Sequence, residues 1–331
     1  MTTKGYVLEM LERSRGQSVS GADIARLLGV TRNAVWKAVR ELEKDGYEIR
    51  AVPNKGYCLG YDNDILSVQG ILPYLADKEN SERIFIHESL ESTNKTAKEL
   101  AVAGARNGTI IIANSQTGGR GRYQRNFFSP PDHGLYMSII LRPMQRNWIS
   151  VPTLVTSSAA VSVCDAIEST TKKTPKIKWV NDILLGGKKI CGILTEAVTD
   201  FESGDMQWIV IGIGVNFIAP AAVDIPEEIA SIAGFIFTCE KPTITRNQLA
   251  AEIANRVLDA ENYFDNNKMI AEYRKRLMII GKRIIVKGSN ESFEAVAVDI
   301  DKTARLIVKK DNGDIVSLFS GEVSICNIDD I

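Results

Sequence analysis

Strand-like runs joined by very short connections constrain this fold more than any other feature of the sequence. Such runs recur between residues 84 and 217, and the connection Leu185-Gly186-Gly187-Lys188 has room only for a tight hairpin turn. Strands joined by a hairpin are antiparallel, while helical patterns separate other runs. We therefore predict an α+β domain whose sheet is at least partly antiparallel. The expected strands cover residues 84–87, 109–114, 134–141, 177–179, 183–185, 190–196 and 208–217, and the expected helices cover 94–103, 151–170 and 248–263.

The first sixty residues follow a different pattern. Ile24, Leu27 and Leu28 have a helical period that Gly29 breaks, and Thr31 is placed to cap a second helix. Two strand patterns, residues 47–52 and 57–59, then flank a Pro-Asn-Lys-Gly turn. The segment predicts a winged helix-turn-helix. The apolar face of its second helix is expected at Val35, Ala38, Val39 and Leu42.

Charge favours a nucleic-acid partner for this segment. The first sixty residues hold ten Lys/Arg against seven Asp/Glu, and no acid occurs from Ile24 to Arg40. The start of the second helix is where such a fold presents groups to the major groove. The alternative is a small interaction module with a solvated basic face. The candidate DNA-binding residues are Thr31, Arg32, Asn33 and Lys37.

Length and composition exclude several classes. A chain of 331 residues suggests two or three domains. Its five cysteines form no C-x-x-C pair, its apolar runs are too short to cross a membrane, and its first residues contain no secretion signal. We therefore expect a cytoplasmic protein. No serine-hydrolase elbow, H-E-x-x-H or P-loop motif is present, which argues against those enzyme classes.

The stretch GGRGRYQRNFFSPP, residues 118–131, predicts a site for an anion. It lies in a window without acids, residues 100–131, that carries four arginines in a chain of net charge -1. Its glycines allow the backbone to move, so the loop can close over a ligand. The sequence alone leaves open whether the loop faces nucleic acid, a nucleotide or only solvent.

Three further stretches could contact the same ligand. ESTNKTAKEL offers hydroxyls and an amide where a strand meets a helix, although capping the helix is the commoner role of such residues. KWVNDILLGGKKICGILTE places Lys189 at the start of an apolar strand, where a lysine can also protect a sheet edge. IGIGVN has two glycines inside a buried strand, which predicts close approach of a ligand or of another backbone.

Taken together, these stretches resemble the biotin protein ligases, in particular the bifunctional kind whose N-terminal winged helix also makes the enzyme a repressor of biotin genes. The GRGR loop and the K-W-x-N-D and K-x-x-G-I-L-x-E stretches carry the resemblance, which extends over essentially the whole chain. It implies a winged helix-turn-helix at residues 1–63 and a central mixed-sheet domain at 64–280. An SH3-like β-barrel follows at 281–331, where strand patterns alternate with turns.

The resemblance also implies a reaction and its partners. Biotin and ATP, the latter with Mg²⁺, would form biotinyl-5′-AMP, and biotin would pass to a lysine of a biotin carboxyl carrier protein of a biotin-dependent carboxylase. Operator DNA of biotin genes would be the second partner, bound by a homodimer that forms when biotinyl-AMP is present. The alternatives are a biotin-sensing repressor without ligase activity and a lipoate or octanoate ligase.

Site residues follow from the same resemblance. Asp182 would orient the lysine amine or accept its proton, although a turn formed with Asn181 is an equal alternative. The implied catalytic residues are Arg122, Lys189 and Asp182. The implied biotin-binding residues are Ser92, Thr93, Asn94, Gln116, Arg120, Gly121, Arg122, Lys189 and Gly192. The implied ATP-binding and adenylate-binding residues are Arg120, Arg122, Lys189, Asn181 and Asn216.

Some positions depart from the family's pattern or leave a role open. The family often has glycine at the position of Gln124, proline at that of Val180 and another arginine at that of Tyr123. The segment 218–235 could order over bound ligand as a second lid or be a structural loop and helix. The C-terminal domain could help to hold ATP or the carrier, or could only stabilise the fold.

Overall fold

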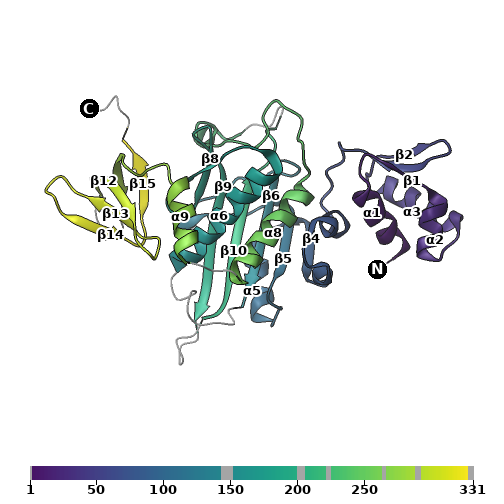
Figure 1. Cartoon of the computed structure of the whole chain (residues 1–331), viewed down its shortest axis with the longest axis horizontal. Helices are drawn as coiled ribbons and strands as arrows, with labels where there is room; N and C mark the ends of the chain where they lie inside the picture. Colours follow the sequence, from purple (N-terminus) through teal and green to yellow (C-terminus); the bar gives the residue numbers. More distant parts are fainter. Residues whose placement is uncertain are drawn as a thin grey trace. The chain divides into compact units, whose positions relative to one another are not determined.

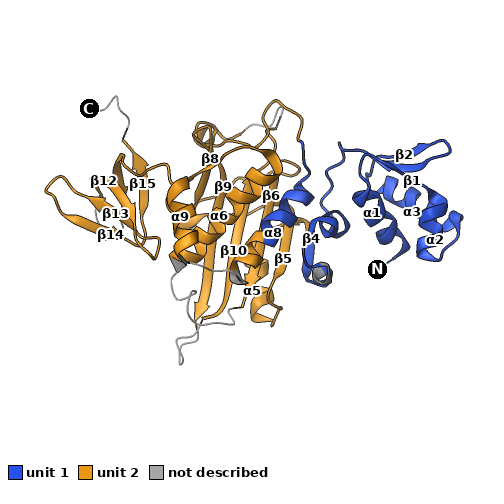
Figure 2. Cartoon of the chain, viewed as in Figure 1, with its two compact units in different colours: residues 1–86, 243–255 blue, residues 87–242, 256–331 orange. Residues whose placement is uncertain are grey.

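The computed structural model describes residues 2–142, 152–199, 206–220, 225–262, 266–287 and 292–326. The chain divides into two compact units, one of residues 1–86 and 243–255 and the other of residues 87–242 and 256–331 (Figure 2). Across the described ranges, no helix combines the length and the apolar character that a membrane span requires.

The first unit begins with the predicted winged helix-turn-helix (Figure 1). Gly29 ends the second helix with a φ of 64°, and the Thr31 hydroxyl caps the third by accepting a hydrogen bond from the Ala34 amide at 3.2 Å. The two predicted wing strands pair, and a short third strand joins them in the order β1-β3-β2. The elements are α1 (Thr3–Arg13), β1 (Ser18–Val19), α2 (Gly21–Leu28), α3 (Arg32–Lys44), β2 (Ile49–Val52) and β3 (Gly56–Leu59).

The core of this module contains the predicted apolar face of α3, and Val35, Ala38, Val39 and Leu42 are all buried. Leu27 differs from the expectation, because 70% of its surface is exposed. Ile24 and Leu28 are four residues apart and share the inner face of α2, whereas Leu27 lies on the flank of that face.

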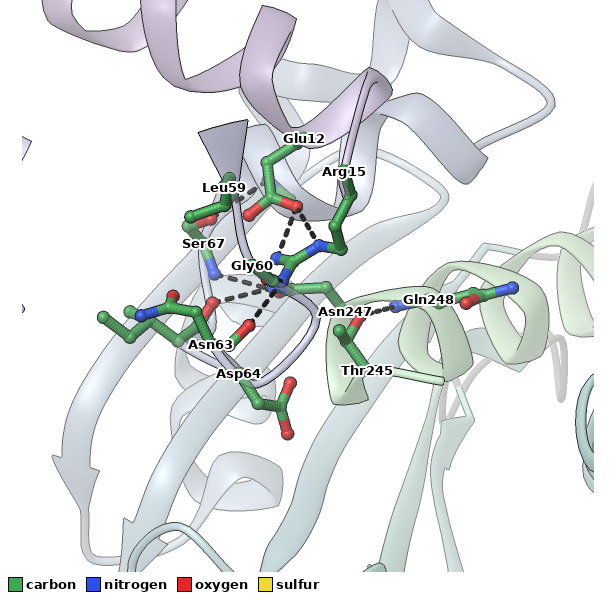
Figure 3. Close-up of polar contacts among 12 residues, drawn as sticks. Glu12, Arg15, Leu59, Gly60, Asn63, Asp64, Ser67, Thr245, Asn247 and Gln248 are labelled. Carbon is green, nitrogen blue, oxygen red and sulfur yellow. Dashed lines mark hydrogen bonds and ion pairs between the residues drawn. The ribbon is translucent and has the colours of Figure 1, made fainter. Parts of the chain in front are cut away.

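A buried ion pair joins α1 to the segment that leaves the wing (Figure 3). The Arg15 guanidinium donates to Glu12 Oε2 at 2.6 and 3.0 Å, and its Nη1 donates to the carbonyls of Gly60 and Asn63 at 2.8 and 2.6 Å. Glu12 and Arg15 are 2% and 8% exposed. Burial raises the pKa of Glu12, and the neighbouring Arg15 opposes that rise.

The same segment then holds the start of α8 (Arg246–Asn262). Asp64 accepts hydrogen bonds from the backbone amide and the Nε of Arg246 at 2.8 and 2.9 Å. Asn247, which is fully buried, accepts from the Ser67 amide at 3.0 Å and donates to the Ile65 carbonyl at 2.7 Å (Figure 3). We call residues Glu12, Arg15, Gly60, Asn63, Asp64, Ser67, Arg246 and Asn247 the polar clip.

A seven-stranded sheet forms the centre of the second unit, in the order β4-β5-β6-β10-β9-β8-β7. The pairs from β5 through to β7 are antiparallel, which confirms the predicted α+β class. The strands are β4 (Ile84–Leu90), β5 (Thr109–Gln116), β6 (Gly134–Leu141), β7 (Lys176–Lys178), β8 (Asp182–Leu185), β9 (Lys188–Thr199) and β10 (Met206–Asn216).

Helices cover both faces of this sheet. Ala97 and Ala101 of α5 pack on Ile111, Ile140 and Val210 of one face. Thr156 of α6 bonds to Thr195 at 2.9 Å, and neighbouring residues of a strand point to opposite faces, so α6 covers the other face. The remaining helices are α4 (Val68–Ile71), η1 (Leu72–Tyr74), η2 (Lys78–Arg83), α5 (Thr93–Val102), η3 (Arg122–Gln124), α6 (Pro152–Thr171), α7 (Glu227–Ala230) and α9 (Asn266–Arg276).

The C-terminal part is a five-stranded antiparallel sheet in the order β14-β13-β12-β11-β15 (Figure 1, yellow). This sheet confirms the alternation of strands and turns predicted for residues 281–331, of which 288–291 and 327–331 lie outside the described residues. The Trp179 indole donates to the Ala304 carbonyl at 3.1 Å, which fixes this sheet to the central one. The strands are β11 (Arg283–Lys287), β12 (Ser292–Ile300), β13 (Leu306–Lys309), β14 (Ile315–Leu318) and β15 (Glu322–Ile325).

Replacing Arg15 with leucine should weaken the first unit by about 3–5 kcal/mol, because the change leaves a buried carboxylate without its cation. Hydrogen exchange of the α1 amides in the full chain measures this locally. The pKa of Glu12 in the folded protein lies above its ordinary 4.5, so at low pH the unpaired carboxyl group of the variant is protonated and neutral. The loss of unfolding free energy therefore grows as the pH rises above about 4.5. The control is Arg13→Leu, which breaks an exposed pair with Glu9 and should cost about 1 kcal/mol or less. Equal losses in both variants would contradict the role of the clip.

Candidate functional site

A cavity of about 320 Å³ opens in the second unit on the face of the sheet that α5 covers. The structure brings together around it twelve residues from four stretches that are far apart in the sequence. Their individual roles stay predictions. All of the predicted biotin-binding, adenylate-binding and catalytic residues line the cavity: Ser92, Thr93, Asn94, Gln116, Arg120, Gly121, Arg122, Asn181, Asp182, Lys189, Gly192 and Asn216.

Glycines clear the floor of this cavity. A Cβ at Gly212 would lie 2.0 Å from Asn94 Oδ1, and one at Gly214 would lie 2.5 Å from the Phe127 ring. The prediction was that a ligand or another backbone approaches these glycines. Side chains of the chain itself do so in the structure, and any larger residue on this face of β10 would displace them.

Polar groups at the start of α5 form one end of the cavity. Ser92 occupies the N-cap position, but its side chain makes no capping hydrogen bond. Gln116 Oε1 accepts from the Thr93 amide at 2.9 Å, and Gln116 Nε2 donates to Ser129 Oγ at 3.0 Å. Helix capping therefore does not account for the Ser92 hydroxyl, which lines the cavity.

Cations form the other end. Lys189 Nζ lies 2.8 Å from Asp182 Oδ1, so Lys189 pairs inside the cavity wall rather than standing alone at a sheet edge. Arg122 Nη1 donates to Asn181 Oδ1 and to the Gly321 carbonyl, both at 3.3 Å. Each of these cations thus has a polar neighbour that an incoming anion could replace or join.

The C-terminal sheet contributes directly to the cavity wall through residues 321–323. Arg125 of the loop makes two hydrogen bonds of 2.7 Å to the Glu322 carboxylate. These bonds hold the pKa of Glu322 below its ordinary value. The C-terminal domain therefore contacts the loop of residues 118–131, which we call the arginine loop.

Two of the residues that differ from the family's usual pattern, Tyr123 and Gln124, lie where the backbone of the loop turns. Tyr123 and Gln124 have φ of 54° and 62°, in the left-handed region that glycine reaches without steric cost. The Gln124 side chain accepts from Arg120 at 2.5 Å, and the Arg122 guanidinium lies 5.1 Å from the centre of the Tyr123 ring. Both side chains thus contact the predicted ligand-binding arginines.

Sequence reasoning missed several lining residues. Lys178 belongs to the K-W-x-N-D stretch, and its charge was the available signal. Phe127 and Phe128 belong to the stretch 118–131 that was predicted to bind an anion, and this was the available signal, whereas only the fold places Tyr136 at the cavity. Part of the segment 218–235, predicted as a second lid or as a structural loop and helix, also lines the cavity, through Ile225, Ile229, Ile232, Ala233 and Phe235. Residues 221–224 of that segment lie outside the described residues. The main additional lining residues are Arg125, Phe127, Phe128, His133, Tyr136, Lys178, Ile229, Ile232 and Phe235.

Neither of the two fully buried cysteines is suited to act as a thiolate, and the described residues form no ready metal cage. Burial raises the pKa of both Cys164 and Cys191. Within the described ranges, no group of three or more His, Cys, Asp or Glu residues is placed to hold a metal ion. The cavity instead offers cations and hydrogen-bond donors, which suit the binding and activation of anions.

The predicted DNA-binding residues lie in the first unit. Thr31, Arg32, Asn33 and Lys37 are all exposed at the start of α3, although the Thr31 hydroxyl is already used as the helix cap. Sequence reasoning missed Trp36, which is 47% exposed beside them and lies 5.5 Å from the Arg40 guanidinium. An exposed tryptophan on a basic helix face was a signal that the sequence contained.

Comparisons with known proteins agree with this arrangement. Residues 86–216 match the Biotin/lipoate A/B protein ligase family, residues 4–58 match an HTH domain, and residues 279–325 match the Biotin protein ligase C terminal domain. The chain is 34% identical to the bifunctional ligase/repressor BirA of Bacillus subtilis, over 98% of this chain and 99% of that protein. Its identity to BirA of Escherichia coli is 27%, over 94% of each. A biotin protein ligase from Aquifex aeolicus, solved with biotin and ATP, has a similar fold, with a TM-score of 0.59, 22% identity, and coverage of 73% of this chain and 98% of that one.

Replacing Glu322 with glutamine should speed tryptic cleavage within the arginine loop about twofold to fivefold, because one exposed ion pair is lost. The pKa of Glu322 is lowered, so its contribution is present throughout the neutral range and is lost only as the pH falls below about 4.5. Mass spectrometry of the cleaved chain gives the rate. Glu294→Gln breaks a different pair of the C-terminal sheet, that with Arg283, and should leave loop cleavage unchanged. The same rate in both variants would show that Glu322 does not hold the loop.

Proposed function

Since the chain belongs to the family of bifunctional biotin protein ligases and repressors, we propose that its cavity is where biotin is activated by ATP and passed to a carrier protein. The chain is a biotin protein ligase with an N-terminal DNA-binding domain, and the repressor role accompanies the ligase role. One observation carries the placement: the twelve residues predicted for biotin, adenylate and catalysis line a single cavity. We also propose the domain limits 1–63, 64–280 and 281–331, and a cytoplasmic location, where carrier and DNA are both accessible.

The polar end of the cavity suits the ureido head of biotin. Ser92, Thr93 and Gln116 supply hydroxyl and amide groups there. A buried ureido N-H or C=O left without a partner costs about 1–3 kcal/mol, so the pocket must offer several such groups. The aromatic side chains that line the cavity, among them Phe127 and Tyr136, would contact the apolar thioether ring and the valeryl chain.

The cationic end suits the reacting groups. A carboxylate oxygen of biotin forms a bond to the α-phosphorus of ATP, and pyrophosphate leaves with the electrons of the broken P–O bond. Both reactants are anions, so Arg120, Arg122 and Lys189 would offset their repulsion and the charge that grows at phosphorus. Mg²⁺ would enter on the phosphates of ATP, because it keeps several of its waters and is usually held by substrate phosphates together with one or two carboxylates.

Transfer to the carrier follows at the same place. The amine of the carrier lysine forms a C–N bond to the acyl carbon, AMP leaves, and the amine loses a proton. Asp182 is the carboxylate that we propose for orienting that amine or accepting the proton, since it lies 2.8 Å from Lys189 at the cationic end. A biotin carboxyl carrier protein would supply the lysine.

The exposed start of α3 suits operator DNA. Arg32, Asn33 and Lys37 would contact base edges or phosphates, and two copies of the chain would contact two half-sites. We propose that biotinyl-AMP favours the homodimer, so that occupancy of the cavity selects between ligase and repressor. Such coupling must be reciprocal, and the homodimer must then bind biotinyl-AMP more tightly than the monomer does.

Ligation is tested with biotin, Mg-ATP and a biotin carrier domain, and the mass of the carrier is the measurement. We expect a gain of one biotinyl group, and Arg122→Ala and Lys189→Ala should each slow it about 100-fold. Lys188→Ala, which removes the exposed neighbouring lysine, is the matched control. Asp182→Asn should slow transfer from preformed biotinyl-AMP, and transfer at the full rate would remove Asp182 from the mechanism. Biotin binding without ligation would instead indicate a sensor, and lipoyl or octanoyl transfer would indicate a lipoate-type ligase.

DNA binding is tested by gel shift on the promoter of the protein's own gene. The double variant Arg32→Ala/Lys37→Ala should bind at least tenfold more weakly, because each base contact contributes about 1–3 kcal/mol of discrimination. Arg13→Ala/Lys44→Ala removes the same charge from other exposed positions of the unit and should have a smaller effect. An unchanged shift of the first variant would exclude the start of α3 as the DNA contact. Sedimentation with and without biotin and ATP reports the proposed dimer.

A further inference from the structure

The side chain of Asn94 is held by three hydrogen bonds at the floor of the cavity. Asn94 Nδ2 donates to Glu196 Oε2 at 2.8 Å and to the Leu194 carbonyl at 3.3 Å, and Asn94 Oδ1 accepts from Ser138 Oγ at 2.7 Å. Asn94 is 6% exposed and Ser138 is fully buried. Both amide protons of Asn94 are therefore already used by the chain.

Glu196 decides the orientation of that amide. A carboxylate can only accept hydrogen bonds, so the NH₂ group of Asn94 must face Glu196 and its oxygen must face Ser138. The oxygen is also packed against the sheet, because a Cβ on Gly212 would lie 2.0 Å from it. With the amide flipped, its NH₂ group would lie over Gly212 and its oxygen would face the carboxylate, so the flip is excluded.

The hydrogen bonds continue from Ser138 to the polar end of the cavity. Ser138 uses its one proton on Asn94 Oδ1, so Thr93 Oγ1, at 2.8 Å, donates to Ser138 Oγ, and Gln116 Oε1 accepts from the Thr93 backbone amide at 2.9 Å. Thr93 and Gln116 are two of the residues proposed for the ureido head. A change at Glu196 can therefore reach them through Asn94 and Ser138, all in hydrogen-bond contact.

Glu196 is also the last residue of the K-x-x-G-I-L-x-E stretch, and it has no part in the activation or transfer steps. Gly192, Leu194 and Glu196 alternate along β9 and so share the cavity face of the sheet. The outer oxygen of Glu196 pairs with Lys98 Nζ at 2.7 Å, with side chains 34% and 39% exposed. The carboxylate thus has one oxygen toward the cavity floor and one toward the surface.

We propose that Glu196 and Ser138 are positioning residues that set the biotin affinity of the cavity by fixing Asn94 and, through it, the Thr93 hydroxyl. Neither residue touches the reacting carboxylate or phosphate in this scheme. Their loss should weaken biotin binding and leave the chemical steps unchanged. The proposal rests on the assignment of the polar end of the cavity to biotin.

Three variants separate the inner hydrogen bond from the outer ion pair. Glu196→Leu removes the acceptor for Asn94, whereas Glu196→Gln keeps an acceptor oxygen and loses the charge. Lys98→Met removes only the outer ion pair. The full-length protein is assayed with biotin, Mg-ATP and a carrier domain for kcat and both KM values, and biotin binding without ATP is measured by calorimetry.

We expect Glu196→Leu to raise the biotin KM and Kd about tenfold or more, the effect of losing a hydrogen bond to a charged group. Its kcat and its KM for ATP should stay within about twofold, and Glu196→Gln and Lys98→Met should bind biotin nearly as the parent does. Ser138→Ala acts on Asn94 from the other side, so it should also raise the biotin KM selectively. This second variant keeps the test decisive should Glu196→Leu fold poorly.

Several outcomes would overturn the proposal. Unchanged biotin affinity in Ser138→Ala and in folded Glu196→Leu is one. An equal loss in Glu196→Gln, Lys98→Met and Glu196→Leu is another, because it would assign the effect to the outer ion pair. Parallel losses in kcat and in the KM for ATP would indicate a general structural role. Failure of the parent protein itself to bind biotin would contradict the proposed function rather than the positioning role.

Discussion

The cavity depends on one constraint, the close approach of side chains to the bare backbone of β10. At Gly212 and Gly214 the sheet has no side chain, and Asn94 and Phe127 fill that space. The floor is therefore set by steric exclusion, while hydrogen bonds from Ser138 and Glu196 fix what lies on it. A sheet with a residue larger than glycine at either position would lose the space that the polar and cationic ends of the cavity share.

Two cations of the cavity are already paired with carboxylates before any ligand enters. Lys189 lies against Asp182, and Arg125 lies against Glu322 of the C-terminal sheet. An anion therefore meets side chains that hold their charge in a defined place, and binding exchanges one partner for another. Such preorganisation lowers the cost of ordering flexible side chains around a phosphate. Through these two pairs, the arginine loop, the central sheet and the C-terminal sheet all contribute to the wall of one cavity.

Much of this arrangement could be predicted from the sequence, because its signals are local. The Gly-Gly turn at residues 186–187, the cap at Thr31 and the apolar run of β6 each depend on neighbouring residues alone. The helix α9 was missed although Ile270, Tyr273 and Leu277 have a helical spacing and are buried. Partners distant in sequence, such as Asn94 with Glu196, leave no periodic trace, so only the folded chain shows them.

The polar clip has a consequence for how such a chain can be divided. Arg246 and Asn247 bond to residues 64–67, so buried hydrogen bonds join two segments that are 182 residues apart in the sequence. A cut directly after the wing, at residue 59, removes Glu12 and Arg15 but keeps residues 64–67, which bond Arg246 and Asn247. A chain that loses its DNA-binding module in this way over evolution can therefore keep the start of α8 unchanged, provided that residues 64–67 remain.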